Sequence, residues 1–145
     1  MSKKIEIVLI GHGKIGSGVL SSLKLIYGDA QNVTSIDTYV EKDFNLVDTA
    51  HNLIEKNKSN ELIVVTDLFG GSVNNEFLKY TNGSNVYLIT GMNLALVLDL
   101  VSKVDMRQNE SVEEIVKSVV SDVKDSIKYC DDNLINSSIQ KDDDF

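Results

Sequence analysis

The 145-residue chain contains no proline, no tryptophan and only one cysteine, Cys130. One cysteine cannot form an intramolecular disulfide, which excludes a small secreted domain held together by disulfides. A single domain of this length buries enough apolar surface to fold without such cross-links. We therefore expect a protein of a reducing compartment, the cytoplasm.

Long hydrophobic runs are absent as well. The longest later apolar stretch, residues 94–101, is far shorter than the ~20 residues of a membrane-spanning helix, and it contains Asp99. Lys3 and Lys4 precede a short apolar run that Glu6 interrupts, and no small-residue cleavage pattern follows. The sequence therefore predicts a soluble protein without a signal peptide.

Positive charge is scarce. The chain has 14 Lys and Arg against 22 Asp and Glu, a formal net charge of −8. The electrostatic field of a protein with this net negative charge repels the phosphate backbones of nucleic acids, and the sequence has no cluster of Lys and Arg to counter it. We expect no nucleic-acid partner, whereas a protein with a basic docking face would be attracted.

Strand-like and helix-like segments alternate along the chain. Short runs mark strands over residues 5–10, 61–66 and 85–90, and "NVTSID", residues 32–37, is interpreted as a further strand. A helical pattern follows each of them. The run 61–66 is apolar without alternation, as in strands that are buried on both faces. These repeats predict an α/β fold, a single open doubly wound sheet of four parallel strands in the order 2-1-3-4 with helices on both faces.

The last predicted helix has the clearest pattern. Ser111 and Glu114 form a capping box at its start. One face is apolar throughout: Val112, Ile115, Val116, Val119, Val120, Val123 and Ile127.

The helical pattern decays after Cys130. We place the domain at residues 1–135 and an acidic, partly disordered tail at residues 136–145. The segment "LINSSI", residues 134–139, is long enough for one more short strand.

Two loops carry residues suited to chemistry. The first strand runs into "GHGKIGSG", which contains His12, and the third into "DLFGGS", which begins at Asp67. In a 2-1-3-4 sheet the winding reverses between strands 1 and 3, and ligands bind there. A carboxylate beside an imidazole holds one ring N–H and leaves the lone pair of the other nitrogen as nucleophile or base.

The second loop also offers donors for an anion. Gly70, Gly71 and Ser72 lead into a helix, so their backbone amides can form an anion-binding nest, to which Ser72 adds a hydroxyl. A nucleophilic histidine, an orienting acid and a phosphate cradle together indicate phosphoryl transfer through a phosphohistidine.

"IGHG" after the first strand, together with "TDLFGGS" after the third, resembles the IIA component of the mannose-type sugar phosphotransferase system, from about residue 5 to 130. The resemblance implies that His12 is phosphorylated on Nε2, that Asp67 holds the other ring nitrogen, and that Gly71 and Ser72 supply amides to the phosphoryl group.

The same resemblance implies the partners. The phosphocarrier protein HPr is the expected donor, and a separate IIB component, which acts with membrane components IIC and IID, is the expected acceptor. Such domains are usually homodimers that exchange a C-terminal strand, a role that residues 134–139 can fill. No cofactor and no metal ion are implied.

The chain departs from the family pattern at two positions. Val73 and Ala95 stand where the family often has proline, a change that can shift a helix start without altering the chemistry. IIA-like domains also occur in regulators and in a dihydroxyacetone kinase phosphocarrier. "GHG" together with "GGS" favours the sugar-uptake branch.

Two other functions stay open. Gly11, Gly13 and Gly16 match the G-x-G-x-x-G turn of NAD- and flavin-binding domains, and Asp37 lies at about the spacing of a ribose-binding acid. A regulatory module that senses its own phosphorylation state is the second alternative.

Three further residues are given structural interpretations. We expect His51 to face solvent, Cys130 to be a partly buried helix residue, and Asn93 to cap a helix near the site. His51 and Cys130 lack metal-ligand spacing with another His or Cys, so no metal site is predicted.

Overall fold

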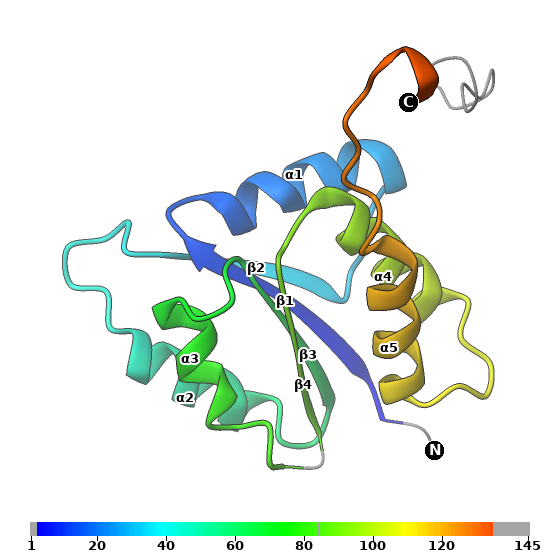
Figure 1. Cartoon of the computed structure of the whole chain (residues 1–145). Coiled ribbons are helices and arrows are strands. Elements are labelled where there is room, and N and C mark those ends of the chain that lie inside the picture. Colours follow the sequence, from blue (N-terminus) through cyan, green and yellow to red (C-terminus); the bar gives the residue numbers. More distant parts are fainter. Residues whose placement is uncertain (1–2, 84, 135–145) are drawn as a thin grey trace.

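The chain folds into an α/β domain around one parallel sheet. The computed structural model describes residues 3–83 and 85–134. All strand pairs are parallel, and the order β2-β1-β3-β4 confirms the predicted topology (Figure 1). The strands are β1 (Ile5–His12), β2 (Val33–Thr38), β3 (Glu61–Thr66) and β4 (Val86–Thr90).

Helices cover both faces of the sheet. One face packs against α1 (Ile15–Tyr27), α4 (Leu94–Asp105) and α5 (Val112–Val123). The other packs against α2 (Leu46–Lys56) and α3 (Ser72–Leu78). This two-sided cover is what right-handed β-α-β crossovers on both sides of a sheet produce.

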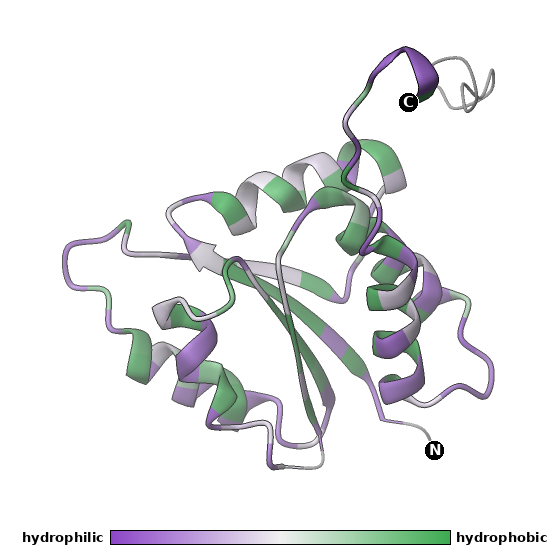
Figure 2. Ribbon diagram, viewed as in Figure 1, coloured by the Kyte–Doolittle hydropathy of each residue, from purple (hydrophilic) through white to green (hydrophobic). Residues whose placement is uncertain are grey.

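The strand side chains alternate between the two hydrophobic clusters. On β1, Ile7 and Leu9 face the α1, α4 and α5 side, whereas Val8 and Ile10 face the α2 and α3 side. All of them are almost fully buried. Figure 2 shows hydrophobic residues along the central strands and both hydrophobic and hydrophilic residues on the helices around them. The non-alternating run in β3 is buried in the same way, as predicted.

Polar side chains cap the starts of α4 and α5. Ser111 and Glu114 form the predicted capping box of α5. Asn93 caps α4 and accepts a hydrogen bond of 2.9 Å from the Leu96 amide, which confirms its interpretation as a cap. The family's proline after "GGS" is not needed to begin α3, because that helix starts at Ser72 and the following Val73 is fully buried.

Two expectations for the C-terminal part of the chain are wrong. Helix α5 ends at Val123, and only Val112, Ile115 and Val119 of its predicted apolar face are buried. Val120 lies one position off this stripe and is exposed, while Ile127 lies beyond the helix end and is 87% exposed.

The expectation that Cys130 is a partly buried helix residue is also wrong, because α5 ends before this position. It is exposed and lies outside any helix. His51 is exposed, as expected.

The predicted strand at 134–139, apart from Leu134, and the tail at 136–145 lie outside the described residues. The exchanged strand and the dimer stay predictions. Within residues 3–83 and 85–134, no helix combines the length and apolar character needed to cross a bilayer.

Gly16 allows α1 to lie directly against the sheet. A Cβ atom at this position would be 2.7 Å from the Leu9 carbonyl oxygen and 3.3 Å from the Ile36 carbonyl oxygen. We predict that Gly16→Ala lowers the free energy of unfolding by about 1–3 kcal/mol, the cost of overpacking a close contact. Chemical denaturation measures the loss.

Gly18→Ala is the matched control in the same helix. A Cβ there meets nothing within 4 Å, so this variant is expected to gain about 0.5–1 kcal/mol from helix propensity. A Gly16→Ala variant as stable as Gly18→Ala would contradict the close packing.

Candidate functional site

The structure brings His12 and Asp67 together at the carboxyl edge of the sheet. His12 ends β1, and Asp67 follows the last residue of the neighbouring β3. Asp67 Oδ2 accepts a hydrogen bond from the His12 backbone amide at 2.9 Å and lies 2.8 Å from His12 Nδ1. One carboxylate oxygen therefore holds both the backbone and the ring of His12.

Asp67 carries a negative charge in this position. Burial by itself raises the pKa of the Asp67 carboxyl. Hydrogen bonds from the His12 amide and ring and from the Leu68 amide outweigh that effect, so the pKa lies below the ordinary value of 3.8. The side chain is only 7% exposed, whereas that of His12 is 44% exposed.

The charge of Asp67 decides the tautomer of the imidazole. An ionised carboxylate can only accept hydrogen bonds, so Nδ1 of His12 must carry the proton that joins them. In the neutral ring, Nε2 then presents a lone pair on the exposed side. Ser72 Oγ is 3.4 Å from this atom. The arrangement is that of a nucleophile whose reactive nitrogen points away from the acid that orients it.

Gly11 makes room for the pair. A Cβ atom at position 11 would lie 2.9 Å from Asp67 Cγ and 2.6 Å from a side-chain carbon of Ile15. Any larger residue would displace the carboxylate from the imidazole. This glycine of the G-x-G-x-x-G pattern therefore has a purpose unrelated to a dinucleotide.

The second loop is held in a tight turn. The Gly71 amide donates to the Leu68 carbonyl oxygen at 3.2 Å, and Asn75 Nδ2 donates to the Gly70 carbonyl oxygen at 3.1 Å. The backbone of Gly71 lies against the imidazole, since a Cβ there would be 3.6 Å from His12 Cε1. Of the three predicted phosphoryl-binding residues, Ser72 faces Nε2 with its hydroxyl, Gly71 lies beside the ring, and Gly70 belongs to the turn.

Sequence reasoning missed Tyr39 and Asn75. Tyr39 follows β2, and its ring stacks on the His12 imidazole with centroids 5.5 Å apart and planes at 26°. The stack depends on how the loops after β1 and β2 meet, and the Asn75 contact depends on the shape of the turn after β3. Neither can be read from the sequence.

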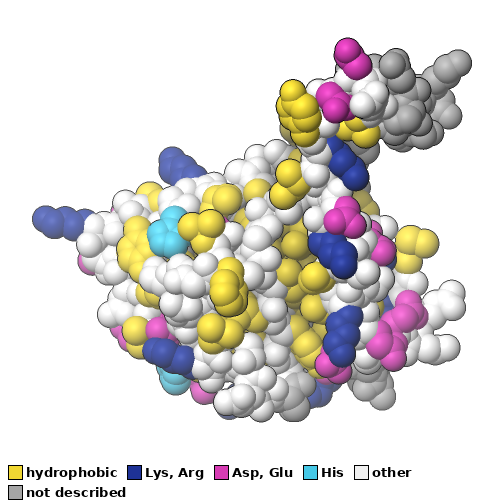
Figure 3. Space-filling view, viewed as in Figure 1, with side chains coloured by type: hydrophobic (Ala, Val, Ile, Leu, Met, Phe, Trp, Pro, Cys, Tyr) yellow, Lys and Arg dark blue, Asp and Glu magenta, His cyan; other side chains and the backbone are white. Residues whose placement is uncertain are grey.

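Exposed apolar side chains lie beside the histidine. Leu68 and Phe69, which directly follow Asp67, are 62% and 83% exposed, and Tyr39 is 50% exposed. Figure 3 shows hydrophobic side chains on either side of a surface histidine on the face in view. Apolar groups left on a rim around a reactive side chain indicate a protein-binding surface.

The carboxylate required by the dinucleotide hypothesis is already engaged. Asp37 Oδ1 accepts a hydrogen bond of 3.0 Å from the Ser17 amide, and Oδ2 accepts one of 2.7 Å from the Ser17 hydroxyl. Asp37 thus secures the start of α1 to the end of β2. This contact argues against its use for a ribose hydroxyl.

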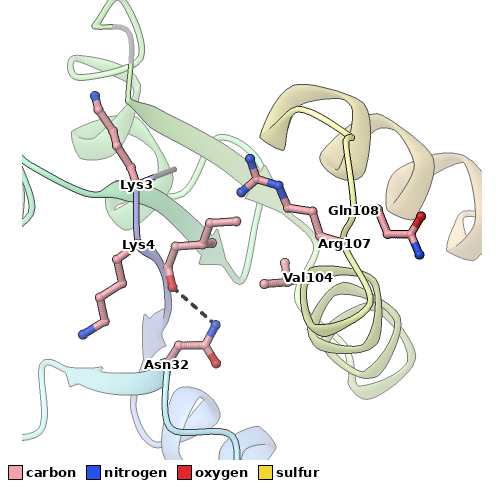
Figure 4. A pocket seen from close by; sticks show the side chains of 7 residues that line it. Lys3, Lys4, Asn32, Val104, Arg107 and Gln108 are labelled. Carbon is pink, nitrogen blue, oxygen red and sulfur yellow. Dashed lines mark hydrogen bonds between the residues drawn. The ribbon is translucent and has the colours of Figure 1, made fainter. Parts of the chain in front are cut away.

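A hollow at the opposite edge of the sheet has a different character. Lys3, Lys4, Asn32 and Arg107 line it at the amino ends of the strands (Figure 4). Its lining contains no histidine and no carboxylate, and the ammonium of Lys4 pairs with Glu6 at 2.8 Å. The carboxyl edge is therefore the candidate site.

Comparison with known proteins agrees with this geometry. The sequence model of the family described as the fructose IIA component of the phosphotransferase system (EIIA-man) matches residues 6–120. The sorbose-specific EIIA component of Lacticaseibacillus casei is 26% identical over 143 residues, which are 96% of this chain and 99% of the relative.

Two solved structures are similar along most of their length. One, from Klebsiella pneumoniae and provisionally described as a permease of the phosphoenolpyruvate-dependent sugar phosphotransferase system, has a TM-score of 0.84 and 30% identity over 92% of this chain and 96% of that one. The other, an EIIA component from Streptococcus agalactiae, has a TM-score of 0.75 and 26% identity over 86% and 96%. The family expected from the two loop motifs is confirmed: this chain belongs to the mannose-type IIA components of the sugar phosphotransferase system.

Proposed function

We propose that this chain is a cytoplasmic phosphocarrier for sugar uptake, in which His12 accepts a phosphoryl group from phospho-HPr and passes it to a separate IIB component. IIB then serves the membrane components IIC and IID. The observation that carries the proposal is the 2.8 Å contact between Asp67 and Nδ1, which leaves Nε2 on the exposed side.

Transfer to His12 is a displacement at phosphorus. The Nε2 lone pair forms the new N–P bond while the bond between phosphorus and its donor atom in phospho-HPr breaks, and the electron pair of that bond leaves with HPr. The ring gains positive charge and keeps its proton on Nδ1. Asp67 stabilises that charge through the hydrogen bond already in place, so little reorganisation is required. Transfer to IIB is the reverse displacement.

The second loop receives the phosphoryl group. Ser72 supplies its hydroxyl, which already lies 3.4 Å from Nε2, and its backbone amide at the first position of α3. Gly71 brings the backbone close to the imidazole, and Gly70 forms the turn before it. In this proposal the Gly71 amide exchanges its bond to the Leu68 carbonyl for one to a phosphoryl oxygen.

Leu68 and Phe69 are proposed to dock the protein partners. A phosphocarrier must bring its histidine against two different proteins in turn. Exposed apolar side chains next to His12 suit such contacts, because burying them in an interface is favourable.

The function is tested by intact mass after incubation with phosphoenolpyruvate, enzyme I and HPr. We expect wild type to gain one acid-labile phosphoryl group and to lose it when IIB is added, and His12→Ala to gain none. Phosphate on His12→Ala would contradict the site. Wild type that keeps its phosphate in the presence of IIB would favour the regulatory alternative.

Asp67→Ala tests the orienting acid. Removing one charged hydrogen bond costs about 1.5–3 kcal/mol, so the rate of phosphorylation by phospho-HPr is expected to fall about tenfold to hundredfold while the fold persists. Rapid-quench kinetics measures the rate, and circular dichroism controls for folding. An unchanged rate would remove Asp67 from the mechanism.

Phe69→Ser tests the docking surface. We expect KM for phospho-HPr to rise about tenfold, as for loss of an aromatic anchor, while phosphorylation by the small donor phosphoramidate stays at the wild-type rate. Leu25→Ser is the matched control, because Leu25 is 88% exposed in the last turn of α1, away from the site. Equal effects of the two variants on KM would place docking elsewhere.

A further inference from the structure

We propose that Tyr39 is a positioning residue, whose hydroxyl orients the Ser72 hydroxyl toward Nε2 of His12 and toward the phosphoryl group once it is attached there. This inference rests on the proposed phosphocarrier function. Tyr39 Oη lies 3.1 Å from Ser72 Oγ, and Ser72 Oγ lies 3.4 Å from Nε2. The three groups come from the ends of β2, β3 and β1, so only the folded sheet edge assembles them.

The direction of the two hydrogen bonds follows from Asp67. Because Nδ1 carries the ring proton and donates it in a hydrogen bond to Asp67, Nε2 of the neutral ring can only accept. Ser72 must therefore donate its hydroxyl proton to Nε2. The remaining contact requires the Tyr39 hydroxyl to donate to Ser72 Oγ. The result is a chain of donors that runs from Tyr39 through Ser72 to the reactive nitrogen.

Tyr39 is held in place at a conformational cost. Its φ of 60° makes it the one non-glycine residue with a positive φ in the described part of the chain. This left-handed region is rarely adopted by large side chains, and strained residues of this kind persist where their surroundings fix them. The stack on His12 and an edge-on contact with Phe44, with centroids 5.2 Å apart, hold the ring.

The backbone before Tyr39 is tied to the His12 loop. The buried Thr38 hydroxyl donates to the Gly11 carbonyl oxygen at 2.8 Å, and the Gly13 amide donates to the Thr38 carbonyl oxygen at 2.9 Å. These two hydrogen bonds join Thr38 to Gly11 and Gly13, the residues on either side of His12. They thereby fix the position of Tyr39 relative to the imidazole. A side chain that served only to fill space at a half-exposed site would not need these constraints.

In this proposal, phosphorylation changes the acceptor of the Ser72 hydrogen bond. Before transfer, Ser72 donates to a neutral nitrogen over a long 3.4 Å contact. Afterwards Nε2 is bonded to phosphorus, and the same hydroxyl donates to an anionic phosphoryl oxygen, a stronger hydrogen bond. A donor that is itself hydrogen-bonded is further strengthened. Tyr39 therefore favours the phosphorylated over the free form of His12.

The experiment compares Tyr39→Phe, Ser72→Ala and the double variant with wild type. Tyr39→Phe keeps the ring and its stack but removes the hydroxyl. Each protein is mixed with phospho-HPr, and the equilibrium partition of the phosphoryl group is read by intact mass. The Nε2 resonance of unphosphorylated protein is recorded by ¹⁵N NMR. Tyr129→Phe is the control, since Tyr129 is 86% exposed and outside the site.

We expect Tyr39→Phe to shift the partition toward phospho-HPr by about three- to tenfold, the value of one net hydrogen bond. Ser72→Ala is expected to shift it by at least as much, and the double variant by no more than Ser72→Ala alone, because Tyr39 acts through Ser72. The Nε2 resonance should move in the same direction in all three. Tyr129→Phe should match wild type in both readouts.

Two results would overturn the inference. A Tyr39→Phe partition and Nε2 resonance equal to wild type would show that the hydroxyl has no effect. A double variant whose shift is the product of the two single shifts would show that Tyr39 acts independently of Ser72. If wild type takes no phosphate from HPr, the proposed function fails, and the Nε2 resonances alone then decide whether the donor chain exists.

Discussion

The hydrogen bond between Asp67 and Nδ1 of His12 is the contact on which the site depends. It fixes the imidazole tautomer, turns Nε2 outward, and places a negative charge where, in the proposed function, the phosphorylated ring becomes positive. The two residues lie 55 positions apart in the sequence and meet because β1 and β3 are neighbours. The crossover topology of the sheet therefore creates the reactive pair.

Several surrounding features protect this contact. Gly11 leaves space for the carboxylate, and Asp67 Oδ2 also accepts a hydrogen bond from the backbone amide of His12, so the same oxygen holds both the loop and the ring. Asn75 holds the turn that carries Gly70. The imidazole is thus oriented in the free protein, which in the proposed function lowers the reorganisation required during phosphoryl transfer.

Much of the fold was readable from the sequence. The predicted strands match the observed ones to within one or two residues. For β1 and β3 the reason is that a strand buried on both faces contains few polar side chains. The common strand order of doubly wound sheets, which the structure confirms, places His12 beside Asp67. The extent of the last helix was not readable, since Ile127 continues its apolar pattern beyond the last helical residue, Val123.

Tyr39 shows why the rest of the site could not be predicted. A tyrosine with a φ of 60° contradicts backbone preference, and its contacts to His12 and Ser72 join three loops that the sequence leaves unconnected. The turn in which the Gly71 amide donates to the Leu68 carbonyl oxygen could not be predicted from the sequence either, because glycine permits many backbone conformations. Residues that depend on several loops at once are visible only in three dimensions.

The most direct test of this account is long-range ¹H–¹⁵N correlation NMR of the histidine rings before and after phosphorylation. The account predicts that unphosphorylated His12 carries its proton on Nδ1 and that the phosphorylated ring is bonded to phosphorus at Nε2. His51, which is exposed and has no side-chain hydrogen bond to the described residues, is the internal control. A His12 ring protonated on Nε2 in the free protein, or phosphorylated on Nδ1, would contradict the account.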